Sequence, residues 1–275
     1  MGLICGQALI CGHAGTPEAD RTGTIRHGIA IYYILRVGAD LCRIAIEKDG
    51  FYTSTKSMQV GIQGDDGGKW QPWNPTVRLV LREKLNPAPM LAKKVETEIP
   101  RTGQAVGFDF FEGDWVAPHG RGRVEDMKVM FTGEYVSRRQ YSARLEVVFP
   151  NDGDGLQAIT SVVEESAFKL PRFAPEIGYQ SQLVLRLGRD MDQGFVNNGE
   201  NHPQNYFIRV RTQKDEDGRI VTAKYGKISG PIGFGGVATK KGTLSLTYYL
   251  NPDGTRNLEF DPDKNLFPGE RMNAP

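Results

Sequence analysis

The chain has 275 residues, of which 39% are hydrophobic and 24% charged, a composition that excludes a disordered protein and supplies ample material for a core. Lys and Arg number 34 against 33 Asp and Glu, so the net charge of +1 gives no reason to expect nucleic acid or a membrane surface as a partner. No stretch approaches the roughly 18 consecutive apolar residues of a transmembrane segment.

The first residues, MGLICGQALICGHAG, are apolar but have no basic residue before the first histidine, so they make a poor signal peptide. We expect residues 1–19 to be an irregular segment. Cys5, Cys11 and Cys42 cannot all pair within one chain, and together with His13 their spacing matches no common zinc finger. The sequence therefore favours buried or terminal thiols, with at most one disulfide, and no metal site.

Short segments with alternating polar and apolar residues predict β-strands along most of the chain. In ARLEVVF, Leu145, Val147 and Phe149 share one face while Arg144 and Glu146 point away. The helical pattern is weak everywhere except for a short turn predicted at 161–170. We predict strands at 29–37, 41–48, 76–84, 126–136, 141–149, 180–188, 205–212, 219–228 and 243–250. Strands of this number, joined by short loops, predict an all-β fold, an antiparallel β-sandwich.

A loop rich in glycine and proline, GDDGGKWQPWNP at residues 64–75, is the strongest candidate for ligand binding. Flat indole rings beside amides and carboxylates suit the face of a sugar, which stacks its C–H surface and hydrogen-bonds its hydroxyls. Tryptophans in such loops also commonly plug the open end of a sandwich, and that structural interpretation is favoured here. The candidate binding residues are Trp70, Trp73, Asp65, Asp66 and Asn74.

The acidic stretch KDEDG at residues 214–218 lies between two predicted strands. A calcium loop of the EF-hand type needs acids at alternate positions and a glutamate about six positions after its glycine. Here the acids are contiguous and Lys224 stands at the glutamate position, so we predict a hairpin turn with Gly218 at positive φ. Alternation also predicts that Arg209, Arg211 and Lys224 form a basic face. This face is a candidate anion site, although a solvated polar face is the ordinary explanation.

The motifs of common enzymes are not found in the sequence. GPIGFGGVATKKGT at 230–243 fits a loose G-x-G-x-x-A, but a predicted strand follows it where a nucleotide site needs a helix. There is no G-x-S-x-G elbow, and His13, His27, His119 and His202 do not have a metal-protease spacing. We therefore assign no catalytic residues and expect no cofactor. A hydrolase is kept as a minor alternative.

Several segments resemble the bacterial carboxypeptidase-regulatory-like (transthyretin-like) β-sandwich proteins of uncharacterised function. The resemblance is carried by Lys48, Gly50 and Phe51 at a strand end and by segments 74–91, 173–180 and 248–262. It implies a sandwich of this kind at residues 20–100. The strand pattern itself breaks at EIPRTGQ, which places the boundary near 98–104, and a second β-rich domain with an extended C-terminal tail is expected at residues 101–275. The resemblance also implies an exported, extracytoplasmic protein without catalytic residues.

The expected function is that of a non-catalytic binding or structural module whose partner is a protein or a glycan. The alternative is a carbohydrate-binding protein, or a weak glycoside-active enzyme, that uses Trp70, Trp73 and the acids beside them.

Overall fold

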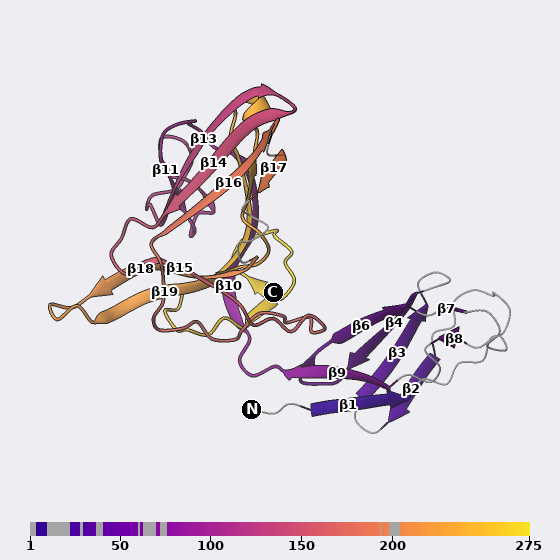
Figure 1. Ribbon diagram of the computed structural model, residues 1–275. Coiled ribbons are helices and arrows are strands. Elements are labelled where there is room, and N and C mark those ends of the chain that lie inside the picture. Colours follow the sequence, from indigo (N-terminus) through magenta and orange to yellow (C-terminus); the bar gives the residue numbers. More distant parts are fainter. Residues whose placement is uncertain are drawn as a thin grey trace. The chain divides into compact units, whose positions relative to one another are not determined.

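The computed structural model describes residues 4–9, 23–27, 30–36, 41–59, 61–62, 70–71, 76–192, 194–197 and 204–275. It confirms the all-β prediction: this part of the chain forms sheets with no α-helix, and its helical structure is the single 3₁₀ turn η2 (Val237–Thr239) (Figure 1). The paired strands are antiparallel except for β22 (Phe260–Asn265), which lies parallel to β10 (Ala88–Glu98). No helix in these residues has the length and apolarity needed to cross a bilayer.

The chain divides into two compact units. The first comprises Met1–Leu85 with Val162–Lys169 and Ala274–Pro275, and the second comprises Asn86–Ser161 with Leu170–Asn273. This division lies before the boundary expected near residues 98–104. The physical reason is strand β10 (Ala88–Glu98), which pairs over its length with a strand of the second unit.

The described residues of the first unit form three sets of paired strands. A four-stranded sheet has the order β2 (Gly23–His27), β3 (Ala30–Arg36), β4 (Leu41–Glu47) and β6 (Ser54–Gln59). A three-stranded sheet has the order β1 (Ile4–Leu9), β9 (Thr76–Glu83) and β5 (Phe51–Tyr52), and β7 (Gly61–Ile62) pairs with β8 (Trp70–Gln71). Residues 4–9 were expected to be irregular, but they form a strand because β9 offers them an antiparallel partner from Ile4 to Leu9.

Segment 162–169 completes the first unit although it lies far along the sequence. The Thr55 amide donates to the Glu165 carbonyl at 2.7 Å, and the Ala167 amide donates to the Thr53 carbonyl at 2.8 Å. Phe168 is fully buried, with its ring stacked on Tyr52 at 4.9 Å between centroids. The short turn predicted at 161–170 is present, because the Ser166 amide donates to the Val163 carbonyl at 3.1 Å, but it does not continue into a helix since the Thr53 carbonyl and the Thr55 amide take up the groups that follow.

The second unit is a sandwich of two sheets. The seven-stranded sheet has the order β15 (Gly155–Ala158), β18 (Tyr206–Lys214), β19 (Ile220–Ile228), β21 (Thr243–Asn251), β10 and β22 (Phe260–Asn265), with β20 (Gly233–Gly235) beside β21. The six-stranded sheet has the order β12 (Asp114–Trp115), β11 (Val106–Asp109), β13 (Met127–Ser137), β14 (Gln140–Val148), β16 (Gln182–Asp190) and β17 (Gly194–Asn197).

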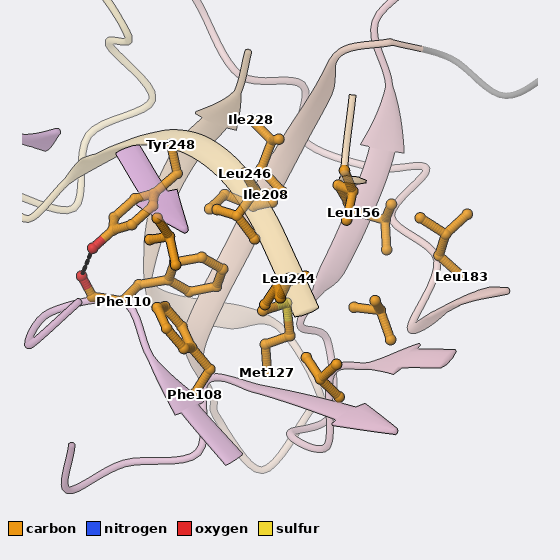
Figure 2. Packing of buried hydrophobic residues seen from close by; sticks show 14 of the residues in the cluster. Phe108, Phe110, Met127, Leu156, Leu183, Ile208, Ile228, Leu244, Leu246 and Tyr248 are labelled. Atoms are coloured by element: carbon orange, nitrogen blue, oxygen red, sulfur yellow. Dashed lines mark hydrogen bonds between the residues drawn. The ribbon is translucent and has the colours of Figure 1, made fainter. Parts of the chain in front are cut away.

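The core of the second unit lies between these sheets (Figure 2). Phe108 and Met127 enter it from the six-stranded sheet, and Ile208 and Leu246 enter it from the seven-stranded sheet. Burying a large apolar side chain contributes about 1.5–3 kcal/mol, which makes this layer the main source of stability. The Tyr248 hydroxyl also lies in the core and donates a 2.7 Å hydrogen bond to the Phe110 carbonyl, so its polar group is satisfied.

The seven-stranded sheet is covered on its other face as well. Met90, Tyr249 and Phe260 form a second buried cluster, against which Met272 of the C-terminal segment packs. The Tyr249 hydroxyl donates to the Asn273 carbonyl at 2.9 Å and so anchors that segment. The six-stranded sheet, in contrast, has one face in the core and leaves polar residues of β13, β14 and β16 on its outer face, where a ligand can reach them.

Candidate functional site

The hairpin predicted around KDEDG is present, and it joins β18 to β19. The Asp215 amide donates to the Arg219 carbonyl at 2.9 Å, and Gly218 has φ of +78°. Contrary to simple alternation, β18 contains a bulge between Val210 and Gln213 in its pairing with β19, and Arg211 in this bulge has φ of +55°. A non-glycine residue pays steric energy in this conformation, so surrounding contacts must hold it there.

The bulge directs Arg209 and Arg211 to different partners, so they do not form one basic face. Arg209 is buried, and its guanidinium donates to the carbonyls of Gly153 at 2.6 Å and Glu176 at 2.8 Å. It also lies over the ring of Tyr179 at 4.3 Å. Lys224 is half-buried on β19 opposite Val210. The three cations thus have separate environments.

Arg211 is the centre of a group of side chains that we call the Arg211 cluster, formed with Asp109, Asp126 and Asp154. Its guanidinium donates to Asp126 at 2.8 and 3.1 Å and to Asp109 at 2.7 Å. The carbon centre of the guanidinium stacks 3.8 Å from the ring centroid of Phe111. Asp154 accepts the Arg211 amide at 2.8 Å, which fixes the bulged backbone itself. The cluster therefore compensates for the strained conformation of Arg211.

The two carboxylates that contact the guanidinium have different acidities. For Asp109, burial opposes ionisation, but amide hydrogen bonds from Arg123, Val124 and Phe111 and the charge of Arg211 outweigh it, so its pKa lies below the ordinary value. For Asp126, burial is the largest influence and raises the pKa, despite its hydrogen bonds to Arg211. The carboxylate oxygens of Asp109 and Asp126 accept hydrogen bonds from donors of the protein itself. We therefore infer that the cluster serves to hold β11, β18 and the loop before β13 together.

The tryptophan loop falls mostly outside the described residues. The predicted binding residues that are not described are Trp73, Asp65, Asp66 and Asn74. Trp70 is described by its backbone pairing with Ile62, which joins β8 to β7. The proposed sugar contact of this loop stays a prediction. Of the cysteines, Cys5 lies on β1 and Cys42 on β4, while Cys11 is outside the described part of the chain.

A hollow of about 610 Å³ lies on the six-stranded sheet at β13, β14 and β16, and we call it the sheet hollow. The side chains on this face of the sheet combine cations, anions and hydroxyls, and they belong to Arg144, Arg186, Glu134, Asp190, Thr132 and Ser142. Tyr141 and Arg189 pair with each other and contribute to the hollow from strand positions whose side chains lie on the opposite face, that of Leu145. The volume lies in the range of about 300–1,000 Å³ that small-molecule sites have.

The strand register determines which residues form the floor of the sheet hollow. Thr132 pairs with Arg144, which pairs with Arg186, so these three residues form one row across β13, β14 and β16. In the next row on the same face, Glu134 pairs with Ser142, which pairs with Gly188. The missing side chain of Gly188 and the small one of Ser142 leave space beside the arginines. The hollow is thus a place on the outer face of the sheet where neighbouring strand positions have no large side chain.

Glu146 orients Arg144 along this face. A carboxylate oxygen of Glu146 lies 2.8 Å from Arg144 Nη1, and the other oxygen accepts a hydrogen bond from the Gln182 amide. The Arg144 side chain is 37% exposed, so its guanidinium keeps access to solvent. Arg186 is exposed beside it. The sequence showed that Arg144 and Glu146 point away from the core, but it contained no signal for their neighbours on β13 and β16.

Val136, at the tip of the β13–β14 hairpin, is the large apolar residue in the lining of the hollow, and it is 70% exposed. Tyr135 and Tyr141 are opposite each other on β13 and β14, with ring centroids 6.5 Å apart. Their strand positions alternate in phase with Phe131 and Leu145, so this pair of rings lies on the face of the sheet opposite the hollow.

Comparisons with known proteins found no matching family model, no matching curated protein and no matching solved structure. The resemblance to carboxypeptidase-regulatory-like modules therefore stays a prediction, and the function has to be argued from the geometry of the described residues.

Proposed function

We propose that this protein is a non-catalytic β-sandwich binding module, and that it binds a glycan in the sheet hollow. The observation that carries the proposal is the composition of that hollow: guanidinium, carboxylate and hydroxyl groups surround a floor of small residues, with the exposed Val136 at its border. Sugars present many hydroxyls that accept and donate hydrogen bonds, and they also present C–H faces that pack on apolar side chains. A lining of both kinds is complementary to them.

The use of the buried carboxylates supports the non-catalytic part of the proposal. A glycosidase requires two carboxyl groups that face a scissile bond across a cleft. Asp109 and Asp126 differ in acidity as such a pair does, but their oxygens accept hydrogen bonds from backbone amides and from Arg211. Glu259 is fully buried as well and is bonded to Arg172 at 2.8 Å. These acids serve the fold.

The tryptophan loop is the second candidate for the glycan site, on the evidence of its residues alone. The two candidates are separated by matched variants: Ser142→Trp fills the sheet hollow from an exposed strand position, and a Trp70→Ala, Trp73→Ala double variant removes the indoles.

We propose further that the protein is exported, as a module for external glycans would be, and fractionation of cells that express the full chain tests this.

The test is a glycan array followed by calorimetry on the glycans that bind. We expect wild-type protein to bind at least one class of glycan, and Ser142→Trp to weaken that binding at least tenfold, because the indole occupies the volume of the ligand. The folded state of the variant is checked by its circular dichroism and thermal midpoint. Binding that persists in Ser142→Trp but disappears in the double tryptophan variant would place the site in the loop and refute the sheet hollow.

A further inference from the structure

Residues Val162–Lys169, which we call the Phe168 segment, belong to the first unit although the residues on both sides of them in the sequence belong to the second. The ends of the segment are held together, because the Val163 amide donates to the Lys169 carbonyl at 3.0 Å. Inside it, the Ser166 hydroxyl accepts the Phe168 amide at 3.2 Å. The segment is therefore a short closed loop that leaves the chain and returns to nearly the same point.

The Phe168 segment is bound at the edge of a sheet. In the described residues β6 is the terminal strand of the four-stranded sheet, and Ser54 at its start forms an antiparallel bridge with Ser166. The Thr55 amide bonds the Glu165 carbonyl beside this bridge. Pairing of an extended segment with a sheet edge is a common mode of peptide recognition, in which backbone hydrogen bonds give affinity and side-chain pockets give specificity.

Phe168 is the anchor of the segment. Its ring stacks on Tyr52, and the guanidinium carbon of Arg82 lies 4.1 Å from the ring centroid on the same residue. Arg82 also donates a hydrogen bond to the Phe168 carbonyl. Lys56 and Glu165, both partly exposed, form an ion pair at 3.6 Å. Tyr52, Lys56, Arg82 and the backbone at the start of β6 thus make up a binding site for the segment, which we call the docking site.

We propose that the docking site takes the Phe168 segment of a second copy of this chain, so that two chains exchange segments and form a symmetric dimer. The occupant seen in the structure identifies the partner, since a second copy presents the same backbone groups, the same carboxylate and the same phenyl ring. Exchange of identical elements needs no new kind of contact, and rising protein concentration favours it. The proposal goes beyond glycan binding and does not depend on it.

The connection between β9 and β10 favours exchange, because the chain passes there from the first unit to the second over few residues. The Lys84 amide donates to the Gly50 carbonyl at 2.7 Å in the first unit. The Asn86 amide donates to the Glu259 carboxylate at 2.9 Å in the second. Leu85 between them is 57% exposed. Short connections promote exchange, since a segment from another copy reaches the docking site free of their constraint.

Two complementary variants of the full chain test the exchange. Phe168→Ser removes the anchor and leaves the docking site intact. Thr55→Pro removes the amide that bonds the Glu165 carbonyl, at a strand edge where proline is tolerated, and leaves the Phe168 segment intact. Neither variant can form the complete contact within one chain, but a mixture can form it between chains. Size-exclusion chromatography with light scattering should give 30.5 kDa for each variant alone and twice that mass in the mixture.

A synthetic peptide of residues 161–170, labelled with a fluorophore, tests the docking site directly. By fluorescence anisotropy, Phe168→Ser is expected to bind it at least tenfold more tightly than wild type, whose own segment competes for the site. A peptide with serine at the phenylalanine position should bind at least tenfold more weakly. Phe173→Ser is the matched control, because Phe173 is 60% exposed and lies outside the segment, so it should behave as wild type.

The same peptide covers a loss of folding in the anchor variant. If Phe168→Ser loosens the first unit, addition of the peptide should raise the thermal midpoint of the variant. Absence of both binding and thermal stabilisation would overturn the docking site, as would equal affinities of Phe168→Ser and wild type. A mixture of Phe168→Ser and Thr55→Pro that stays monomeric would overturn the second copy as occupant, even if the peptide binds. A dimer of either variant alone would also contradict exchange.

Discussion

The second unit contains arginines in two contrasting environments. In the Arg211 cluster the guanidinium is 27% exposed, and two carboxylates with exposed fractions of 2% and 1% enclose it. In the sheet hollow Arg144 and Arg186 are opposite each other on the outer face of the six-stranded sheet, and Glu146 pairs with Arg144. The buried carboxylates need the Arg211 guanidinium, because an ionised group away from water must be matched. The Arg144–Glu146 pair keeps contact with water, so the fold depends on it less.

Breaking the buried set should have the largest effect. Arg211→Met removes the guanidinium and leaves Asp109 and Asp126 buried without their counter-ion, so we expect a loss of about 3–5 kcal/mol in the free energy of unfolding. Urea denaturation followed by tryptophan fluorescence or circular dichroism measures this loss. Arg219→Gln, at an exposed ion pair, is the control and should change stability by less than about 1 kcal/mol. Similar losses in the two variants would contradict the assignment of the Arg211 cluster to the fold.

A milder change to the same set should have an intermediate effect. Asp109→Asn keeps the shape of the side chain but removes its charge, and we expect a loss of about 1–3 kcal/mol at neutral pH because the variant weakens the hydrogen bonds to Arg211 and to the amides of Arg123 and Val124. The midpoint of urea unfolding provides the measurement. A more stable variant would show that the free-energy cost of burying the Asp109 charge exceeds the stabilisation from its hydrogen bonds.

Acid distinguishes the two carboxylates of the cluster. Because the pKa of Asp109 lies below its ordinary value in the folded state, its contribution is complete above the unfolded value of about 4 and is lost as pH falls through the lowered pKa. The raised pKa of Asp126 acts in the opposite direction, since its protonation removes a buried charge as pH falls through that raised value. Unfolding midpoints measured below about pH 4 should therefore fall less steeply in Asp109→Asn than in wild type. Parallel profiles would contradict this assignment.

Altering an arginine of the sheet hollow should have the smallest effect on stability. Arg144→Gln removes one partner of the ion pair with Glu146, whose arginine side chain is 37% exposed, and we expect the free energy of unfolding to change by less than about 1 kcal/mol. Urea unfolding of the variant and of wild type provides the measurement. A loss as large as that of Arg211→Met would show that Arg144 serves the fold as Arg211 does.

The predicted strands illustrate what local pattern can establish. Segments 126–136 and 141–149 were expected from alternation alone, and they form β13 and β14 with Phe131 and Leu145 in the core. Strand β10, at Ala88–Glu98, was not among the predicted strands. In the structure the register of β10 with β22 shifts between Ala88 and Met90, next to Pro89, so the proline falls at an irregularity where its missing N–H does no harm.

The candidate sites illustrate where local pattern fails. Alternation placed Arg209 and Arg211 on one face, but the bulge turned Arg211 towards Asp109 and Asp126, which lie 102 and 85 residues away in the sequence. No residue near Arg211 in the sequence indicates that Asp109 and Asp126 are its partners. The sheet hollow was missed for the same reason. Its components are ordinary outward-facing residues until three strands come into register.

By itself the sequence determined that this chain folds into sheets, because a two-residue apolar period buries one face of each strand wherever the strand is placed. It also determined the hairpin at Gly218, whose turn depends on neighbouring residues alone. Only the tertiary structure decided which charges serve the fold and which face a ligand. Register, bulges and burial arise from contacts between distant segments, and these set whether an arginine meets a carboxylate, another arginine or water.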